Sequence, residues 1–542
     1  MTIRQIYPNL GEKFNRKKYF TKKKVSLNYK CNKYTKFNAM ESLKRMEVWF
    51  VTGSQHLYGE ETLKLVQVHA NEIAEKLNEL PEIPVQIIAR PVVTTPSAIY
   101  KICMDANHSD RCVGLIMWMH TFSPAKMWIA GLQALKKPFV HLHTQFNRDI
   151  PWNEIDMDFM NLNQSAHGDR EFGFIVSRLR KNRKVITGHW QDKEVHRQVG
   201  VWARAACGWA EAQKIKIARF GDNMREVAVT EGDKVEAQMR LGWSVNGFGI
   251  GELTNMIKEV SEQEIDRLVE EYEQSYIMMP ELRKGGGKHA SLREAASIEL
   301  GLRAFLKQGD FQGFTDTFED LHGMLQLPGI AVQRLMKDGY GFGAEGDWKM
   351  AAMLHIMHTM ALGLPGGNSF MEDYTYHLKP DNMMVLGAHM LEISPSLTRT
   401  KPSCEIHPLS IGGKDAPVRL VFNAEPGPAM NVSMIDMGNR FRLIVNKVEA
   451  IVPPHDLPKL PVARVLWKPL PDLKTAATAW IYAGGAHHTC FSQNLTDEHI
   501  ADFADMAGME MLTIDEKTDL KAFRDQLKWN EMYYMLAGSL RG

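Results

Sequence analysis

The sequence lacks the features that mark disulfide-rich, membrane-spanning or nucleic-acid-binding proteins. Its six cysteines are scattered and form no Cys-x-x-Cys spacing, so we predict no disulfide framework and a reducing compartment, the cytoplasm. No apolar run reaches the roughly 18–20 residues that a membrane span needs. The formal net charge of +1 gives no overall attraction to nucleic acid or to anionic membranes.

The chain has the length and the apolar content for several folded domains. Its 542 residues, of which 44% are hydrophobic, exceed what one hydrophobic core supports and predict about three domains. We expect a basic, disordered extension over residues 1–45, an N-terminal α/β domain over 46–214, a central α/β domain over 215–365 and a β-rich C-terminal domain over 366–542.

Residues 1–45 differ in charge from the rest of the chain. They carry 13 Lys and Arg against two acids, Glu12 and Glu41, so this extension has a net charge of +11 and the remainder −10. It has no apolar core of a secretory signal. We favour a translated stretch upstream of a true start at Met40 or Met46. A disordered tail that binds acidic partners and an organelle-targeting peptide are the alternatives.

From Met46 onward, short apolar runs alternate with amphipathic segments. We expect strands over 48–52, 85–89, 113–119 and 138–142, and helices over 60–80, 97–107 and 123–135, the last with Ser123 as N-cap. This alternation predicts a doubly wound parallel sheet.

Ligands bind such sheets at the carboxyl ends of the strands. That edge carries Gln55, His56, His120 and His143 in this chain. The loop after the first strand has no Gly-x-Gly-x-x-Gly, so we do not expect a nicotinamide cofactor.

The central region repeats the α/β pattern and predicts a second doubly wound parallel sheet. We expect helices over 262–276 and 291–307, the second with Ser291 and Glu294 in capping-box spacing. Two glycine-rich pieces, 247–251 and 285–288, lack the spacing of a phosphate-binding loop and are predicted as plain loops.

The last third changes character. Short, partly alternating runs over 418–423, 430–436 and 441–448 are separated by proline and glycine. This pattern predicts antiparallel strands, arranged as a small barrel or sandwich.

Two glutamates and two histidines in the last two hundred residues stand beside glycines or at the edge of apolar runs. They are Glu345, Glu372, His389 and His488. A flexible backbone beside them can turn their side chains into a cavity. Two carboxylates and two imidazoles form a mixed O/N ligand set that suits Mn²⁺, Co²⁺ or Zn²⁺. Carboxylates at such an ion can also move protons, and sugar isomerisation needs both capacities.

These residues also have structural explanations. Glu345 precedes a helix predicted over 348–360, where an acid favours the positive end of the helix dipole. The four residues are separated by 27, 17 and 99 positions, and spacings of this length do little to identify a metal site. His355 and His358, three residues apart, form a weaker candidate pair for a metal.

Long stretches from Met46 to the C-terminus resemble the L-arabinose isomerase family. These stretches are 48–59, 120–128, 156–167, 219–228, 317–323, 345–349, 370–377 and 483–489. The resemblance implies a fucose-isomerase-like architecture, isomerisation of L-arabinose and of D-galactose, Mn²⁺ with Co²⁺ as a substitute, and a homohexamer. The basic extension departs from the family pattern.

The resemblance also implies roles for single residues. The metal ligands would be Glu345, Glu372, His389 and His488, with His487 beside the last leaving the fourth ligand open. The sugar pocket would be lined by Gln55, Phe122, Gln164, His167 (lent by a neighbouring subunit), Met224 and Phe318.

Conversion of an aldose to a ketose moves one proton between C2 and C1 and another between their oxygens. We expect Glu345 and Glu372 to act as the acid/base pair through a cis-enediol, with a metal-assisted hydride shift as the alternative route. Two other hypotheses compete with an isomerase. A non-catalytic sugar-binding protein does not need metal-ligating carboxylates, and a metal-dependent hydrolase would use an activated water in place of a chelated diol.

Overall fold

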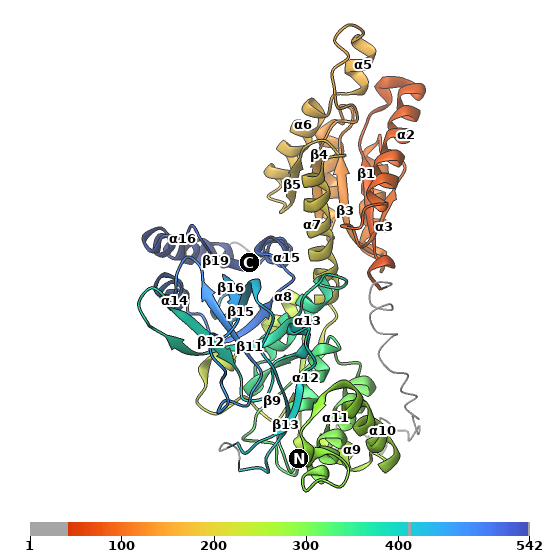
Figure 1. Ribbon diagram of the computed structural model, residues 1–542. Coiled ribbons are helices and arrows are strands. Elements are labelled where there is room, and N and C mark those ends of the chain that lie inside the picture. Colours follow the sequence, from red (N-terminus) through yellow and green to blue (C-terminus); the bar gives the residue numbers. More distant parts are fainter. Residues whose placement is uncertain (1–41, 410–412, 540–542) are drawn as a thin grey trace, which may run out of the picture.

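The computed structural model describes residues 42–409 and 413–539 (Figure 1). The predicted basic extension therefore lies outside the described residues up to position 41. No helix in the described part combines the length and the apolarity needed to cross a membrane.

The N-terminal region is built on a five-stranded sheet in which all pairs are parallel. Its strands are β1 (Glu47–Thr52), β2 (Gln86–Ala89), β3 (Cys112–Trp118), β4 (Phe139–His143) and β5 (Lys184–Thr187), in the order β2-β1-β3-β4-β5. Alternate residues of β1 enter two different hydrophobic clusters, Val48 and Phe50 on one face and Trp49 and Val51 on the other. Both faces are covered, so the prediction of a doubly wound parallel sheet is confirmed here.

The helices of this region are α2 (Gly59–Asn78), α3 (Pro96–His108), α4 (Ile129–Ala134), α5 (Met157–Leu162), α6 (Ser165–Arg178) and α7 (Lys193–Ala212). The predicted capping role of Ser123 is wrong. Its hydroxyl is buried and accepts a hydrogen bond from Trp128 Nε1 at 3.0 Å, and a 3₁₀ turn, η3 (Ala125–Trp128), precedes α4. The hydroxyl is therefore engaged with a ring and does not cap the helix.

The central region contains a second parallel sheet, as predicted. Its strands are β6 (Lys216–Phe220), β7 (Ser244–Phe248), β9 (Gly313–Asp316) and β10 (Gly341–Gly343), in the order β10-β9-β6-β7. Its helices are α8 (Lys234–Leu241), α9 (Ile250–Lys258), α10 (Glu262–Ser275), α11 (His289–Gly309), α12 (Gly329–Lys337) and α13 (Trp348–Met360).

Two local predictions in this region are corrected. Helix α11 begins at His289, so Ser291 lies inside the helix; the capping box belongs to α10, where Ser261 and Glu264 bond each other's backbone. The segment from 247 was predicted as a loop, but Gly247 pairs with Arg219 within the sheet. Segment 285–288 is a loop, as predicted.

The C-terminal region is a seven-stranded mixed sheet. Its strands are β11 (Asn368–His377), β12 (Met384–Ala388), β15 (Gly427–Asp436), β16 (Phe441–Ile451), β17 (Arg464–Pro469), β18 (His488–Ser492) and β19 (Glu510–Ile514), in the order β15-β18-β11-β12-β17-β16-β19 with an additional pairing of β15 and β16. Strand β19 pairs parallel with β16 and the other pairs are antiparallel. The predicted antiparallel pairing is therefore confirmed for all of these pairs except β16–β19, which makes the sheet mixed, and a barrel stays a prediction.

One predicted C-terminal strand belongs elsewhere. Strand β14 (Val418–Val421) joins β13 (Ser403–Ile406) and β8 (Ile277–Met278) in a separate three-stranded sheet. The large sheet is accompanied by α14 (Leu473–Tyr482), α15 (Asp497–Ala507) and α16 (Leu520–Ser539). The predicted domain boundaries stay predictions.

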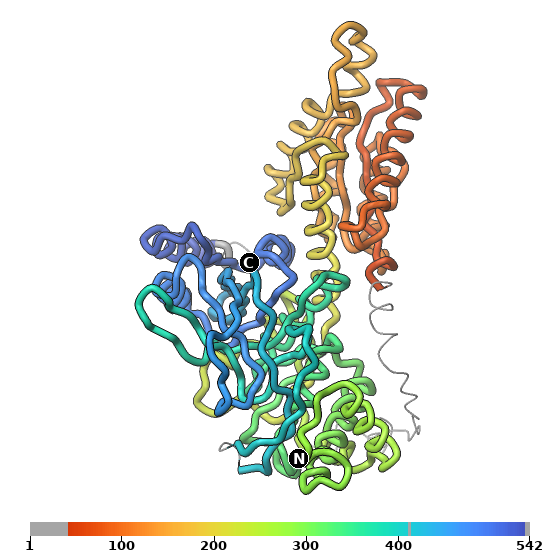
Figure 2. Tube along the Cα trace, viewed as in Figure 1, coloured from red at the N-terminus to blue at the C-terminus, as the bar shows by residue number. Residues whose placement is uncertain are grey.

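The N-terminal region projects from the rest of the molecule. In Figures 1 and 2 the sheet β1–β5 and its helices stand above a body formed by the central and C-terminal regions, with α5 at the far tip. Helix α7 runs from the projecting region down to the body, where it packs against α13 and α15. A ligand site at the tip and one in the body are therefore well separated within one chain.

Candidate active site

The four predicted metal ligands come from four different elements of the body. Glu372 lies in β11 and His488 opens β18, and the two form a cross-strand pair. His389 follows the last residue of β12, and Glu345 lies in the 3₁₀ turn η6 (Ala344–Gly346) between β10 and α13. Glu372, His389 and His488 are buried, and Glu345 is partly buried.

The structure brings these four side chains together. Oε1 of Glu372 lies 3.1 Å from His389 Nε2 and 3.3 Å from His488 Nε2. Oε2 of Glu345 lies 3.6 Å from the same nitrogen of His488. A series of close contacts therefore runs from His389 through Glu372 and His488 to Glu345.

The second nitrogen of each imidazole is held by another carboxylate. His488 Nδ1 donates to Asp347 Oδ2 at 3.0 Å, and His389 Nδ1 donates to Glu392 Oε2. Such contacts fix the ring orientation and leave Nε2 directed at the cluster. The sequence analysis did not identify Asp347 and Glu392. Asp347 stands two residues after Glu345, and Glu392 stands three after His389. This closeness in sequence is the feature that could have identified them.

Glu345 is held in a strained backbone conformation. Its φ and ψ are 60° and 26°, in the left-handed region that non-glycine residues seldom adopt. Met224 N donates to Glu345 O at 3.0 Å. The next residue, Gly346, has a φ of 85°, and a Cβ there would lie 2.6 Å from Asn223 Cα. The strained backbone at this position therefore directs the side chain of Glu345 toward the cluster.

The acid that caps α13 is Asp347, not Glu345. Its side chain accepts hydrogen bonds from Lys349 N and Met350 N and forms a buried ion pair with Lys349 Nζ at 3.0 Å. The alternative explanation of Glu345 as a helix-start carboxylate is therefore wrong. Its carboxylate is left facing the cluster.

The carboxylates around the cluster stabilise positive charge on its two imidazoles. Burial opposes protonation of His488, but Asp347, Glu345 and Glu372 outweigh it and raise the pKa of this imidazole to about 10. Burial likewise opposes protonation of His389, whose pKa is nevertheless raised well above its usual value by Glu372 and Glu392. The pKa of Glu372 lies well below its usual value, because His389 and His488 outweigh burial. A divalent cation would take the place of those protons.

Buried atoms that lack a hydrogen-bond partner test whether these residues fit a metal ion. Glu372 Oε1 and His488 Nε2 are buried and have no hydrogen-bond partner within the described chain. Two carboxylates and two imidazoles form a donor set that suits Mn²⁺ or Co²⁺. The residues present therefore fit a divalent ion.

His487 is a neighbour of this cluster. One potential ligand atom of His487 lies within 4.8 Å of those of Glu345 and His488, although its side chain is exposed. The weaker candidates of the sequence do not join it: His355 Nδ1 donates to Gly339 O, and Nε2 lies 3.2 Å from Glu211 Oε1.

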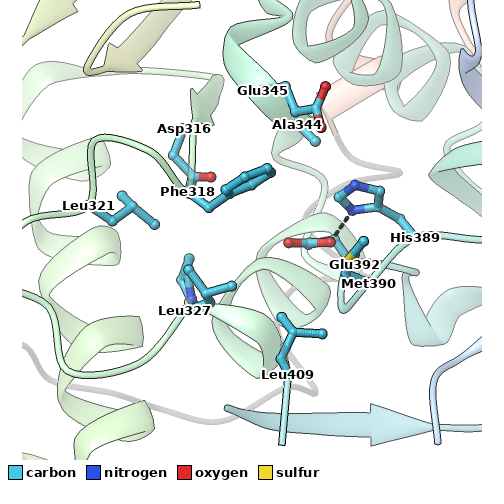
Figure 3. Close-up of a pocket in the computed structure, with 11 residues that line it drawn as sticks. Asp316, Phe318, Leu321, Leu327, Ala344, Glu345, His389, Met390, Glu392 and Leu409 are labelled. Carbon is cyan, nitrogen blue, oxygen red and sulfur yellow. Dashed lines mark hydrogen bonds and ion pairs between the residues drawn. The ribbon is translucent and has the colours of Figure 1, made fainter. Parts of the chain in front are cut away.

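A cavity opens beside the cluster. Figure 3 shows Asp316 and Phe318 on one side of it and Glu345 and His389 on the other. Burial, reinforced by Glu392 and opposed by His389, raises the pKa of Asp316 to about 7. Phe318 was predicted to line a sugar pocket, and it does line this cavity; Asp316 was missed.

Of the other predicted pocket residues, Met224 lies in the body, where its N donates to Glu345 O, and four gather at the carboxyl edge of the N-terminal sheet. Gln164 Nε2 donates to Tyr58 OH at 3.1 Å, and Tyr58 N donates to Gln55 O. His167 N donates to Gln164 O, and the rings of His167 and Phe122 lie 4.7 Å apart. We call Gln55, Phe122, Gln164 and His167 the rim residues.

The rim residues do not meet the metal-ligand candidates within one chain. Gln164 and His167 lie at the junction of α5 and α6, at the projecting tip, whereas β11 and α13 lie in the body (Figure 1). Of the other edge residues, His120 stacks on Trp118 and His143 Nδ1 donates to Asp169.

Three family models match successive parts of the chain. They describe the L-arabinose isomerase N-terminal domain over residues 42–214, the central domain over 216–363 and the C-terminal domain over 367–510. A solved ABC sugar transporter (periplasmic sugar binding protein) from Legionella pneumophila covers 58% of this chain at 11% identity, with a TM-score of 0.14 that is too low to bear on its fold.

Relatives named L-arabinose isomerase match nearly the whole chain. The protein from Herpetosiphon aurantiacus is 62% identical over 501 residues, which is 92% of this chain and 100% of the relative. Those from Geobacillus stearothermophilus and Flavobacterium johnsoniae are each 60% identical and cover 91% and 92% of this chain and 99% of their own. On these matches and on the fold beneath them, the chain belongs to the L-arabinose isomerase family.

Proposed function

We propose that this protein isomerises L-arabinose to L-ribulose, the first step of L-arabinose catabolism, with a divalent cation, Mn²⁺ or Co²⁺, held by Glu345, Glu372, His389 and His488. The observation that carries the proposal is the series of contacts of 3.1, 3.3 and 3.6 Å that joins His389, Glu372, His488 and Glu345 beside a cavity. D-Galactose has the same configuration as L-arabinose at C2, C3 and C4, so we propose D-tagatose formation as a second activity.

The chain's carboxylates would carry the proton transfers. A cation bound at the cluster supplies Lewis acidity that makes the C2–H bond of the aldose more acidic. Glu345, whose side chain lines the cavity, removes the proton from C2 and returns it to C1. Glu372 holds the proton that passes between O1 and O2. Asp347 and Glu392 keep the two imidazoles oriented.

The non-catalytic sugar-binding hypothesis is not favoured. Holding a neutral sugar does not call for two carboxylates buried against two imidazoles, because burying charged groups is costly unless they serve a bound ion or a reaction. The likeness to the Legionella pneumophila transporter is too slight to support it.

We further propose a cytoplasmic homohexamer in which the rim residues of one subunit complete the cavity of another. The support is the separation of the two groups within one chain and an exposed apolar surface beside the rim. Trp152 and Met157 are 79% and 65% exposed, and Ile150 and Met160 are exposed as well. Apolar side chains gathered at a tip favour contact with another protein surface.

The test is an assay of ketose formation from L-arabinose after removal of metal with EDTA. We expect the stripped protein to be inactive and added Mn²⁺ to restore L-ribulose formation. A folded protein that forms no ketose with Mn²⁺ or Co²⁺ would overturn the proposal and favour sugar binding.

The same assay run in D₂O tests for the enediol route. In the enediol route the proton held by Glu345 can exchange with solvent before it reaches C1, whereas a hydride shift carries the hydrogen from C2 to C1 without exchange. Deuterium on C1 of L-ribulose would therefore exclude the hydride shift; a product without deuterium fits either a hydride shift or a proton that Glu345 returns before it exchanges.

A further inference from the structure

Asp316 is a buried acid that the proposed metal site does not use. It is the last residue of β9, at the carboxyl edge of the central parallel sheet, where ligands bind in such folds. The residue is 8% exposed and lines the cavity beside Phe318 (Figure 3).

The carboxyl group of Asp316 has no hydrogen bond or ion pair among the described residues. The other buried acids there all have partners: Asp169, Glu299, Asp347, Glu372, Glu392, Asp502 and Glu510 contact imidazole, guanidinium, ammonium or hydroxyl groups. Buried polar groups are normally paired, because an unpaired one forfeits its hydration. The partner of Asp316 is therefore expected to arrive with a ligand.

The other polar side chains of the cavity already have roles. Glu345 and His389 belong to the proposed metal-ligand set, and Glu392 accepts from His389 and from Leu391 N. The rest of the lining is apolar: Phe318, Leu321, Leu327, Pro328, Ala344, Met390 and Leu409. Within the lining that one chain supplies, Asp316 is thus the remaining polar side chain that can contact a sugar away from the cluster.

We propose that Asp316 binds one hydroxyl of the aldose beyond C2, on C3, C4 or C5, and so contributes to the choice of sugar. The inference rests on the proposed function. With C1 and C2 placed at Glu345 and His389, the remaining carbons extend into the cavity, where the opposite side carries Asp316. The hydroxyl supplies the partner that this carboxyl lacks.

The test compares kcat/KM for L-arabinose and for its 3-deoxy, 4-deoxy and 5-deoxy analogues, using the Mn²⁺-loaded enzyme. Asp316→Leu, which keeps a similar shape, should lower kcat/KM for L-arabinose roughly 10- to 100-fold, as expected for loss of a hydrogen bond to a carboxyl group. For one deoxy sugar the wild type and Asp316→Leu should be equal, because the contact is already absent.

Two further variants serve as a conservative replacement and as a control. Asp316→Asn retains an acceptor oxygen and should recover most of the loss, including in the event that Asp316→Leu does not fold. Thr315→Val alters the preceding residue of β9, which lies outside the cavity lining, and should leave all four kcat/KM values unchanged.

Specific outcomes overturn the inference. An equal loss on all four sugars would mean that Asp316 contacts no hydroxyl. A parallel loss of Mn²⁺ affinity, measured by titration, would mean that Asp316 acts through Glu392 and His389. Absence of turnover by the wild type with Mn²⁺ would overturn the proposed function itself and this inference with it, and that result is distinct from the other two.

Discussion

Each buried imidazole of the site has carboxylates at both of its nitrogens. His488 lies between Asp347 on one side and Glu345 and Glu372 on the other. His389 lies between Glu392 and Glu372. Asp347 and Glu392 hold the imidazoles from the far side. Loss of the carboxylate of Glu345 or Glu372 should therefore abolish catalysis while the two imidazoles keep their orientation.

Glu345→Gln and Glu372→Gln should each lower kcat by roughly 10²- to 10⁴-fold, the usual contribution of a positioned acid or base. The amide keeps the shape but neither ligates a cation as a carboxylate does nor accepts a proton. Initial rates at saturating Mn²⁺ measure the effect, and thermal unfolding checks that the fold is intact. Glu449→Gln, an exposed acid on β16, should be indistinguishable from wild type. Near-normal turnover in Glu345→Gln would remove it from the mechanism.

Residues of the site were predictable to the extent that they carry local signals. The four metal-ligand candidates stand beside glycines or at run edges, and the family resemblance added the rim residues. Asp347 and Glu392 were within reach, because each follows a candidate by two or three positions. Asp316 was not, since its lack of a partner is a property of tertiary packing.

At the scale of elements, periodicity predicted best where contacts are local. The strand and helix order of the N-terminal sheet followed from apolar runs and amphipathic spacing. The predicted capping roles of Ser123 and Ser291 were wrong, because a serine caps a helix only when its hydroxyl is free and the helix begins at the next residue. The placement of β14 and the parallel pairing of β19 depend on distant partners that spacing does not reveal.

One contact between elements should give a measurable pH dependence. Glu211 of α7 lies 3.2 Å from His355 of α13 at the junction of the projecting region and the body. Burial opposes ionisation, but the hydrogen bond from His355, helped by Lys214, lowers the pKa of Glu211 to about 2. A carboxyl whose pKa is depressed on folding stabilises the fold above its unfolded value, near 4.5, and loses this contribution as pH falls toward 2.

We therefore expect Glu211→Gln to lower the free energy of unfolding by about 1–3 kcal/mol at pH 6, as for loss of a charged hydrogen bond. The difference from wild type should shrink at pH 3.5. Thermal midpoints at the two pH values measure it. Glu273→Gln, an exposed acid on α10, is the control and should show no difference at either pH. A constant difference for Glu211→Gln would contradict the assignment.

At the scale of the whole molecule, the elongated shape separates two parts of one predicted pocket. The rim residues lie at the tip and the metal-ligand candidates in the body (Figure 1). If subunits share sites, an inactive rim variant and an inactive cavity variant should complement each other.

His167→Ala and Glu345→Gln, unfolded and refolded together at equal amounts, should regain about a quarter of wild-type activity, because random assembly of a head-to-tail oligomer pairs an intact rim with an intact cavity at that frequency. Ketose formation by the mixture and by each variant alone measures it. Glu345→Gln mixed with Glu372→Gln is the matched control and should regain nothing, since both lesions lie in one cavity. No recovery in the first mixture would argue for sites within single chains.

The cross-strand pairing of Glu372 with His488 also has a consequence for how the chain folds. Side chains on a strand alternate between faces, so a slip of one residue between β11 and β18 would place these two groups on opposite sides of the sheet. Correct register and a complete ligand pair therefore form in the same event. An ion that binds both would stabilise only correctly paired chains, so the metal available during synthesis would select against misregistered sheets before any sugar is bound.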